Sequence, residues 1–232
     1  MKQLFNSFFS NEVIAETLDD SVDFTLGSNQ APLTGIQQKF VKEYYGIDNL
    51  ATIRQVHGDN IVVVDKINNA RKDVLAEADA LVTNMPHAAL SVRTADCLPV
   101  FIFDPVQKAI GLVHAGWKST QKKITALTVQ KMIQLFGSNP KDLKAAFGPA
   151  IHACCYEVNE EFAQYFPEEV IQRHDKYFFD NALANINQLT VAGVLGENIF
   201  DCGECTVCGK GYFSFRRDGE KAGRMMSVMM LK

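Results

Sequence analysis

One cysteine and two histidines are the side chains of this 232-residue sequence best suited to chemistry. His57 and His114 each lie beside a glycine-containing turn, and Cys97 precedes a short apolar run. Catalytic zinc usually has three His, Cys or carboxylate ligands and keeps one position open. We therefore predict that His57, Cys97 and His114 bind one zinc ion. Another interpretation stays open, a buried thiol and two hydrogen-bonded imidazoles, because the three residues form no compact metal-binding motif.

The elements that must position these residues are short strands. Runs of β-branched and other apolar residues, separated by turn residues, predict strands over 51–56, 61–64, 80–82, 89–92, 100–103 and 109–113. The ends of neighbouring strands could place three side chains around a common point. The same reasoning predicts one or two edge strands within 11–26, a loop over 68–76, and strands over 143–147, 199–200, 212–215 and 225–231.

The apolar spacing of helices occurs before Gly46 and again after Trp117. Helices are predicted from Thr34 or Gly35 to Tyr45, from Ser119 or Thr120 to Phe136, over 159–166 and over 181–195. Gly46 and Gly196 are expected to end the first and last of them. The long helix should bury a stripe formed by Ile124, Leu127, Met132 and Leu135. This order of strands and helices predicts one α+β domain.

The composition excludes several classes of protein. The net charge is −4, and the basic residues are scattered, so no footprint for nucleic acid is present. No apolar run approaches the ~20 residues that cross a bilayer, and no signal peptide is evident at the N-terminus. We expect a cytoplasmic protein with no membrane partner, whose six cysteines stay reduced.

The remaining cysteines and histidines leave one question open. Cys202, Cys205 and Cys208 follow a C-x-x-C-x-x-C spacing that is typical of metal sites, but no fourth cysteine follows them. A second metal is therefore left undecided. Cys154 and Cys155 are expected to be buried thiols. Surface or hydrogen-bonded positions are expected for His87, His152 and His174.

Several ordered motifs resemble one protein family. They are Gln55-Val56-His57-Gly58, Ala78-Asp79-Ala80-Leu81-Val82-Thr83, Ala95-Asp96-Cys97-Leu98-Pro99-Val100, His114-Ala115-Gly116-Trp117, Gly148-Pro149-Ala150-Ile151, Cys154-Cys155-Tyr156-Glu157-Val158, Phe213-Ser214-Phe215-Arg216-Arg217-Asp218-Gly219 and Gly223-Arg224. They cover the chain from about Leu50 to its end. In type and order they are similar to the YfiH/YlmD, or laccase-domain, family.

The resemblance implies a fold, a metal and an activity. The fold would be α+β, with mixed β-sheets packed together and flanked by helices in α/β/β/α layers. Residues 1–232 would form a single domain with a divergent region over 1–49. The positions of His57, Cys97 and His114 would bind zinc. The activity would be zinc-dependent phosphorolysis of adenosine, inosine and methylthioadenosine, together with adenosine deamination. The partners would be a purine nucleoside and phosphate, and the protein would be a monomer or homodimer.

Further site residues are predicted from their places beside these motifs. With the three ligands, Asp96 is a candidate catalytic residue, because it could orient a ligand imidazole or take a proton; a structural salt bridge is the alternative. Gln55, Arg216 and Arg217 are candidate substrate-binding residues, although adjacent strand residues face opposite ways, so at most one arginine should reach phosphate. Trp117 could stack on a base or belong to the core.

The N-terminal region departs from the family. Family members carry an arginine-containing Gly-Gly loop near the N-terminus, whereas this chain has no arginine before Arg54. Its closest remnant is Phe24-Thr25-Leu26-Gly27. The phosphate or sugar contacts of that loop must therefore come from elsewhere or be absent.

Three other functions remain open at this point. A His₂Cys site could bind copper with a weak methionine ligand, as in a laccase-like polyphenol oxidase, although five histidines are few for a multicopper centre. Cys97 could instead be the nucleophile of a cysteine hydrolase that edits peptidoglycan precursors. The zinc could also stabilise a binding module without catalysis.

Overall fold

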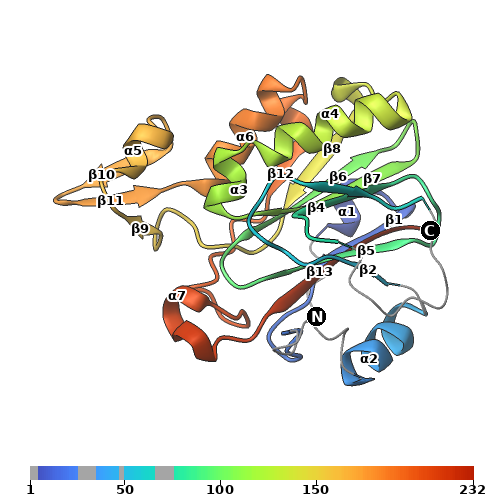
Figure 1. The fold of residues 1–232 in the computed structure, drawn as a ribbon, viewed down its shortest axis with the longest axis horizontal. Helices are drawn as coiled ribbons and strands as arrows, with labels where there is room; N and C mark the ends of the chain where they lie inside the picture. Colours follow the sequence, from blue (N-terminus) through green and yellow to red (C-terminus); the bar gives the residue numbers. More distant parts are fainter. Residues whose placement is uncertain (1–4, 26–34, 47–49, 66–75) are drawn as a thin grey trace.

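Two β-sheets packed face to face form the centre of the molecule, and helices cover the two outer faces (Figure 1). The computed structural model describes residues 5–25, 35–46, 50–65 and 76–232. The first sheet has the order β1 (Val13–Thr17), β13 (Met225–Leu231), β5 (Ala89–Thr94) and β2 (Leu50–Thr52). Strand β1 lies at its edge, as the sequence predicts.

The second sheet is larger and mixed. Its order is β12 (Ile199–Asp201), β8 (Lys144–Phe147), β6 (Leu98–Asp104), β7 (Ala109–Ala115), β4 (Ala80–Thr83) and β3 (Ile61–Val63). Strands β6 and β7 form an antiparallel hairpin in which His114 lies opposite Pro99. The chain passes from the first sheet to the second between β5 and β6, through Ala95, Asp96 and Cys97. Cys97 therefore lies where the two sheets meet.

The main core fills the space between the two sheets. Leu90 of β5 and Met229 of β13 belong to the same buried cluster as Phe101 of β6 and Leu112 of β7. The short helix α1 (Asn6–Phe9) closes this cluster with aromatic rings, and the ring centroids of Phe5 and Phe101 are 4.9 Å apart. Strands β6 and β7 are buried along their whole length. Their nearly continuous apolar sequences are typical of strands that are covered on both faces.

Helices complete the four layers. Helices α4 (Ile124–Phe136) and α6 (Asn181–Val191) cover the outer face of the six-stranded sheet, as their shared buried cluster with its strands shows. Helix α2 (Gly35–Tyr45) lies over the other sheet, where Phe40 and Tyr45 pack against Met226 and Val228. Figure 1 shows these helices on opposite sides of the two sheets. The expected α/β/β/α arrangement is confirmed.

A smaller unit extends from one end of the molecule (Figure 1). Its sheet has the order β10 (Val170–Arg173), β11 (Lys176–Phe179) and β9 (Glu157–Val158), and helix α5 (Phe162–Tyr165) packs beside it. The rings of Phe166 and Phe179 pack against each other at its centre in a tilted arrangement, with centroids 4.3 Å apart. The sequence patterns did not predict the β10–β11 hairpin. Asn159 does not cap a helix to Phe166, because α5 begins only at Phe162.

The predicted helix over 119–136 is two helices. Helix α3 (Trp117–Gln121) ends at Lys122, and α4 begins after Lys123, whose φ of +64° lies in the left-handed region. A residue in that conformation cannot continue an α-helix. The buried stripe of α4 differs in part from the predicted one: Ile124 and Met132 are buried as expected, but Leu135 is 45% exposed and Val129 is buried.

The C-terminal third brings further corrections. Residues 212–215 are not a strand; the short helix α7 (Phe215–Asp218) begins there, and the Ser214 hydroxyl accepts a hydrogen bond from the Arg217 N–H. Helix α6 ends at Val191, before the Gly196 that was expected to stop it. Single turns of 3₁₀ helix span Pro140–Asp142, Gly196–Asn198 and Gly219–Lys221. The predicted bounds of β13 are confirmed.

Some expectations cannot be compared with the structure. Residues 68–75 of the predicted loop over 68–76 and part of the remnant over 24–27 lie outside the described residues, as do Thr34 and the side chains of Ile36 and Val41. The helix that ends at Gly46 is confirmed, with a φ of +67° at that glycine. Within the described segments, no helix has the length and apolar character that crossing a bilayer requires.

Candidate metal centre and its cavity

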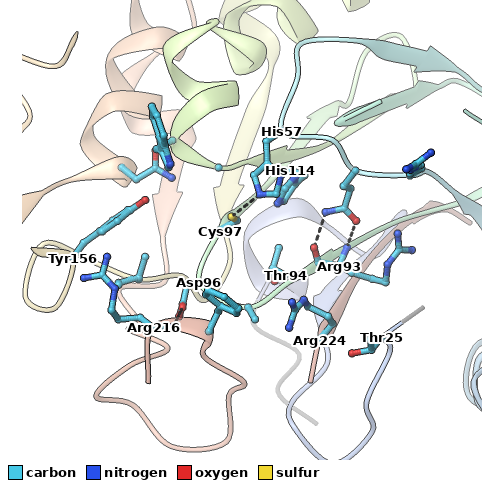
Figure 2. A pocket seen from close by; sticks show the side chains of 18 residues that line it. Thr25, His57, Arg93, Thr94, Asp96, Cys97, His114, Tyr156, Arg216 and Arg224 are labelled. Atoms are coloured by element: carbon cyan, nitrogen blue, oxygen red, sulfur yellow. Dashed lines mark hydrogen bonds between the residues drawn. The ribbon is translucent and has the colours of Figure 1, made fainter. Parts of the chain in front are cut away.

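The three predicted ligands lie together. His57 follows β2, Cys97 lies between β5 and β6, and His114 is the second-last residue of β7. Ligand atoms of all three lie within 4.8 Å of one another, and Nε2 of His57 is 3.7 Å from Sγ of Cys97. Figure 2 shows the three side chains pointing toward one another. Two imidazoles and a thiolate are a ligand set that catalytic zinc sites use.

Asp79 organises this centre, and sequence reasoning gave it no role. It immediately precedes β4 and is fully buried. Its Oδ1 lies 2.8 Å from Nδ1 of His114, which leaves Nε2 of that ring for a metal. The same carboxylate accepts hydrogen bonds from the N–H groups of Val56, His57 and Gly58, at 3.2, 3.0 and 2.6 Å. One buried carboxylate thus fixes both histidines.

The backbone around the centre adopts uncommon conformations. His57 has a φ of +57° and Asp96 a φ of +90°. Residues other than glycine rarely adopt positive φ, and such strain persists only where the surroundings fix it. The hydrogen bonds to Asp79 fix the first of these turns. In this turn conformation, Nε2 of the His57 ring lies 3.7 Å from Sγ of Cys97.

Gly116 leaves room for the three side chains. A Cβ atom built on Gly116 would lie 2.8 Å from Cδ2 of His57 and 3.1 Å from Sγ of Cys97. A larger residue would therefore push both side chains away from their common point. This space, the donor set and the Asp79 contact all fit a zinc ion.

The charges of the centre reinforce one another. Burial raises the pKa of the Cys97 thiol, but the charges and hydrogen bonds of His114 and His57 outweigh burial and lower this pKa to about 6. Burial lowers the pKa of His114, whereas the Cys97 thiolate and Asp79 raise it to about 9. Without a metal, the pair is a thiolate beside an imidazolium. A thiolate is the form of cysteine that binds metals and acts as a nucleophile.

A cavity of about 530 Å³ opens onto the centre. This volume is typical of sites for small molecules. Its wall includes Trp117 and Tyr156 together with several arginines. Figure 2 shows Tyr156 and Arg216 on one side of the three candidate ligands and Arg93 and Arg224 on the other. Trp117 contributes to the wall while it packs on Phe162, with ring centroids 5.0 Å apart.

Asp96 and Gln55 line this cavity, but their polar atoms already have protein partners. Asp96 accepts hydrogen bonds at 2.6 Å from the Thr206 hydroxyl and from the Arg216 N–H. Gln55 exchanges two hydrogen bonds with the backbone of Arg93, at 2.6 and 2.8 Å. Neither contact joins a ligand imidazole. Asp96 therefore positions the α7 segment, and the catalytic and substrate roles of the two residues stay predictions.

The two neighbouring arginines face different surroundings. Arg216 lines the cavity, where its guanidinium lies 5.4 Å from the centroid of the Tyr156 ring and donates to the Glu157 carbonyl at 2.9 Å. Arg217 is absent from the described lining and pairs with Asp218 at 2.8 Å. As predicted, only one of the two arginines reaches the cavity. The prediction placed them on a strand, however, whereas both lie in helix α7.

Three further arginines in the cavity wall were not predicted: Arg54, which pairs with Glu77 at 2.6 Å, Arg93 and Arg224. Arg93 is 8% exposed, and its guanidinium donates to the Thr52 hydroxyl and to the Ile53 carbonyl. Burial and the charge of Arg224 lower the pKa of Arg93 to about 10. The Arg224 guanidinium donates to the Ala222 and Gly223 carbonyls at 2.6 and 3.0 Å, and the Arg224 N–H donates to the Asp23 carboxylate at 2.8 Å. Arg224 could have been predicted as a site residue from the sequence, because it belongs to the Gly223-Arg224 motif.

The remaining cysteines form a second group that could hold a metal ion. Cys154 is exposed and Cys155 is half-buried, so the expectation of buried thiols is wrong. Sγ atoms of these two residues lie within 4.8 Å of those of Cys205 and Cys208. Cys202 is not a member of this group. His87 and His174 are exposed, as expected, and His152 is half-buried with its Nε2 unbonded among the described atoms.

Several known proteins are similar to this chain. The family described as multi-copper polyphenol oxidoreductase laccase matches residues 24–232. A purine nucleoside phosphorylase of Clostridium acetobutylicum is 35% identical over 197 residues, which are 83% of this chain and 81% of that protein. An adenosine deaminase named RL5, from an unknown prokaryotic organism, is 31% identical over 201 residues, which are 80% and 76% of the two chains.

A solved structure shares the fold. The crystal structure of the Bacillus licheniformis hypothetical protein YfiH superposes with a TM-score of 0.87 at 30% identity. The superposition covers 96% of this chain and 94% of the other. The α/β/β/α arrangement is therefore that of a YfiH-like fold.

Proposed function

We propose a function for this chain, which belongs to the multi-copper polyphenol oxidoreductase laccase family: it is a zinc-dependent purine nucleoside phosphorylase that also deaminates adenosine. The observation that carries the proposal is the group of His57, Cys97 and His114 at the wall of a cavity of about 530 Å³. The relatives named as a phosphorylase and as a deaminase support the two reactions. The substrates would be adenosine, inosine and methylthioadenosine.

The roles of the three ligands follow from their contacts. His57, Cys97 and His114 would hold the zinc, which when bound supplies a Lewis acid to polarise a substrate atom. Asp79 holds His114 in the tautomer that presents Nε2. It also holds the turn of His57 through backbone N–H groups. These contacts prepare the ligand positions before substrate binds.

Phosphate would bind between Arg93 and Arg224. Two guanidiniums on one side of the cavity would attract a dianion, although Asp23 lies beside Arg224 and accepts a hydrogen bond from its N–H at 2.8 Å. Phosphorolysis requires such an oriented anion, because a phosphate oxygen attacks C1′ of the ribose while the bond from C1′ to the purine breaks. These arginines would supply the anion contacts in a chain that has no arginine before Arg54. Arg216 is the second candidate for this contact.

The purine would lie on the opposite side of the cavity, near Trp117 and Tyr156. Burial raises the pKa of the Tyr156 hydroxyl, and the nearby Cys97 charge raises it further. The hydroxyl therefore keeps its proton at neutral pH and can donate a hydrogen bond to the departing base. Aromatic rings on this side suit a flat purine.

A copper oxidase is less consistent with the side chains. Only two of the five histidines, His57 and His114, belong to a group that could hold a metal in the described chain. A multicopper centre needs more imidazoles than this. A Cys97 hydrolase would need the thiol free of metal, so protection of Cys97 from iodoacetamide by zinc would contradict that alternative.

The test is a product assay with zinc-loaded protein. Adenosine with phosphate should give adenine and ribose 1-phosphate, and adenosine alone should give inosine and ammonia. Cys97→Ala should abolish both reactions, whereas Cys202→Ala, which alters a cysteine outside both metal groups, should retain them. The proposal is wrong if none of these products forms, or if Cys97→Ala turns over adenosine like the parent protein.

A further inference from the structure

Four cysteines form a compact group apart from the proposed catalytic centre. Cys154 and Cys155 follow β8, and Cys205 and Cys208 lie between β12 and α7. All four Sγ atoms lie within 4.8 Å of one another, and those of Cys154 and Cys208 are 3.8 Å apart. Sulfur ligands at ~2.3 Å around a tetrahedral zinc ion lie about 3.8 Å from each other. The four thiols thus have the number and spacing of a zinc site.

Backbone pairing brings the two segments together. Ala150 forms a parallel bridge with Cys205, in which the Ala150 N–H donates to the Glu204 carbonyl at 3.1 Å and the Thr206 N–H donates to the Ala150 carbonyl at 2.9 Å. The bridge is independent of the sulfur atoms. It therefore aligns the cysteines before any ligand is bound.

The segment from Cys205 to Gly209 forms a tight turn around the first sulfur. The Gly209 N–H donates to the Cys205 carbonyl at 2.7 Å, and a Cβ atom on Gly209 would lie 2.4 Å from that oxygen, so only glycine fits. The N–H groups of His152, Val207 and Cys208 donate to the Cys205 sulfur.

Two arginines lie against the same segments. Arg173 donates to the Ala153 carbonyl at 3.2 Å, and Arg217 donates to the Thr206 carbonyl at 2.9 Å. A divalent ion with four thiolates carries a net charge of −2. The Arg173 guanidinium can offset part of this charge, whereas Arg217 is already paired with Asp218.

We propose that the four cysteines bind a structural zinc ion, separate from the ion of the catalytic centre. Four thiolates leave no open position, which is typical of structural and not catalytic zinc. The ion would clamp the segment after β8 to the segment before α7. Tyr156 follows one pair of cysteines directly, and Arg216 in α7 lies eight residues after Cys208. The clamp would therefore fix one wall of the cavity.

Metal counting tests the proposal on protein purified under reducing conditions without added metal. Zinc per chain should fall by one equivalent in Cys208→Ser relative to the parent protein. Cys202→Ser is the matched control, because Cys202 lies in the same region but packs against the main core, and it should keep the full zinc content. This difference does not depend on whether His57, Cys97 and His114 bind zinc.

Cobalt provides a second measurement that does not alter the four cysteines. The Cys97→Ser variant, loaded with Co²⁺, should show the strong thiolate-to-cobalt charge transfer and the visible bands of a tetrahedral all-sulfur site. This result decides the question even if Cys208→Ser fails to fold. Equal zinc in the parent and Cys208→Ser, iron in place of zinc, or a Cys154–Cys208 disulfide in metal-free protein would each overturn the proposal.

Discussion

Replacing Gly116 with alanine should weaken zinc binding at the catalytic centre while leaving the fold intact. The new Cβ would lie 2.8 Å from the His57 ring and 3.1 Å from the Cys97 sulfur. Ordinary carbon contacts begin near 3.5 Å, so the ring must move by roughly 0.7 Å. Metal–ligand distances tolerate only about 0.2 Å. The displacement is several times larger than that tolerance.

The expected loss can be bounded from known effects. Disturbing the residues that orient zinc ligands costs about 10–100-fold in affinity, and a tenfold change corresponds to about 1.4 kcal/mol. The free energy of unfolding of the metal-free protein should change by less, on the order of 1 kcal/mol, because the exposed His57 side chain can move into solvent. The φ of Gly116 is −74°, so alanine adds no backbone strain.

The assay is competition for zinc between the protein and a chelator of known affinity. Gly196→Ala is the matched control, because a Cβ at Gly196 meets nothing within 4 Å and its φ is not positive. Gly116→Ala should bind the catalytic zinc at least tenfold more weakly than Gly196→Ala. Equal affinities in the two variants would refute the inference that His57 and Cys97 hold one ion beside Gly116.

Three other predictions follow from particular contacts. Asp79→Asn should lower zinc affinity by about 10–100-fold in the same chelator assay, since it weakens the contacts that orient His114; an unchanged affinity would contradict this role. Arg224→Ala should raise the KM for phosphate more than the KM for adenosine, whereas Lys108→Ala, which alters an exposed lysine paired with Glu12, should change neither; equal effects of Arg224→Ala on the two KM values would place phosphate elsewhere. Burial raises the pKa of Glu16, so its ionisation destabilises the fold as pH rises through that pKa, although the Tyr45 hydroxyl opposes part of the shift. Glu16→Gln should therefore gain stability over the parent at pH 8 and lose this advantage toward pH 4, as urea unfolding at several pH values would show; a difference independent of pH would contradict the burial argument.

Local sequence patterns were sufficient to predict an element where a single residue type or a single run of apolar residues determines its structure. The run from Met225 to Leu231 is apolar and lacks glycine and proline, and it forms β13 with those bounds. Gly46 ends α2 because glycine readily adopts positive φ. The same patterns failed at Lys123, where a lysine adopts the left-handed conformation that breaks the predicted helix.

That break has a tertiary cause. Helix α3 packs against the start of α6, where the Thr120 hydroxyl donates to the Asn181 side chain at 2.8 Å and Asn181 donates to the Ala115 carbonyl at 2.7 Å. These buried contacts fix α3 separately from α4. Helical periodicity in sequence cannot reveal them, because the partners lie about sixty residues away.

The sequence by itself determined the chemistry that this protein could perform. The residue types of His57, Cys97 and His114, set among ordered family motifs, already predicted a zinc site. Only the tertiary structure decided which neighbours support it. Asp79 precedes β4 of the six-stranded sheet, and Arg93 lies in β5 of the four-stranded sheet. Both side chains lie near the site because the two sheets meet there. The four-cysteine group likewise exists because Ala150 pairs with Cys205. Ligand type is a property of single residues, whereas convergence depends on long-range strand pairing.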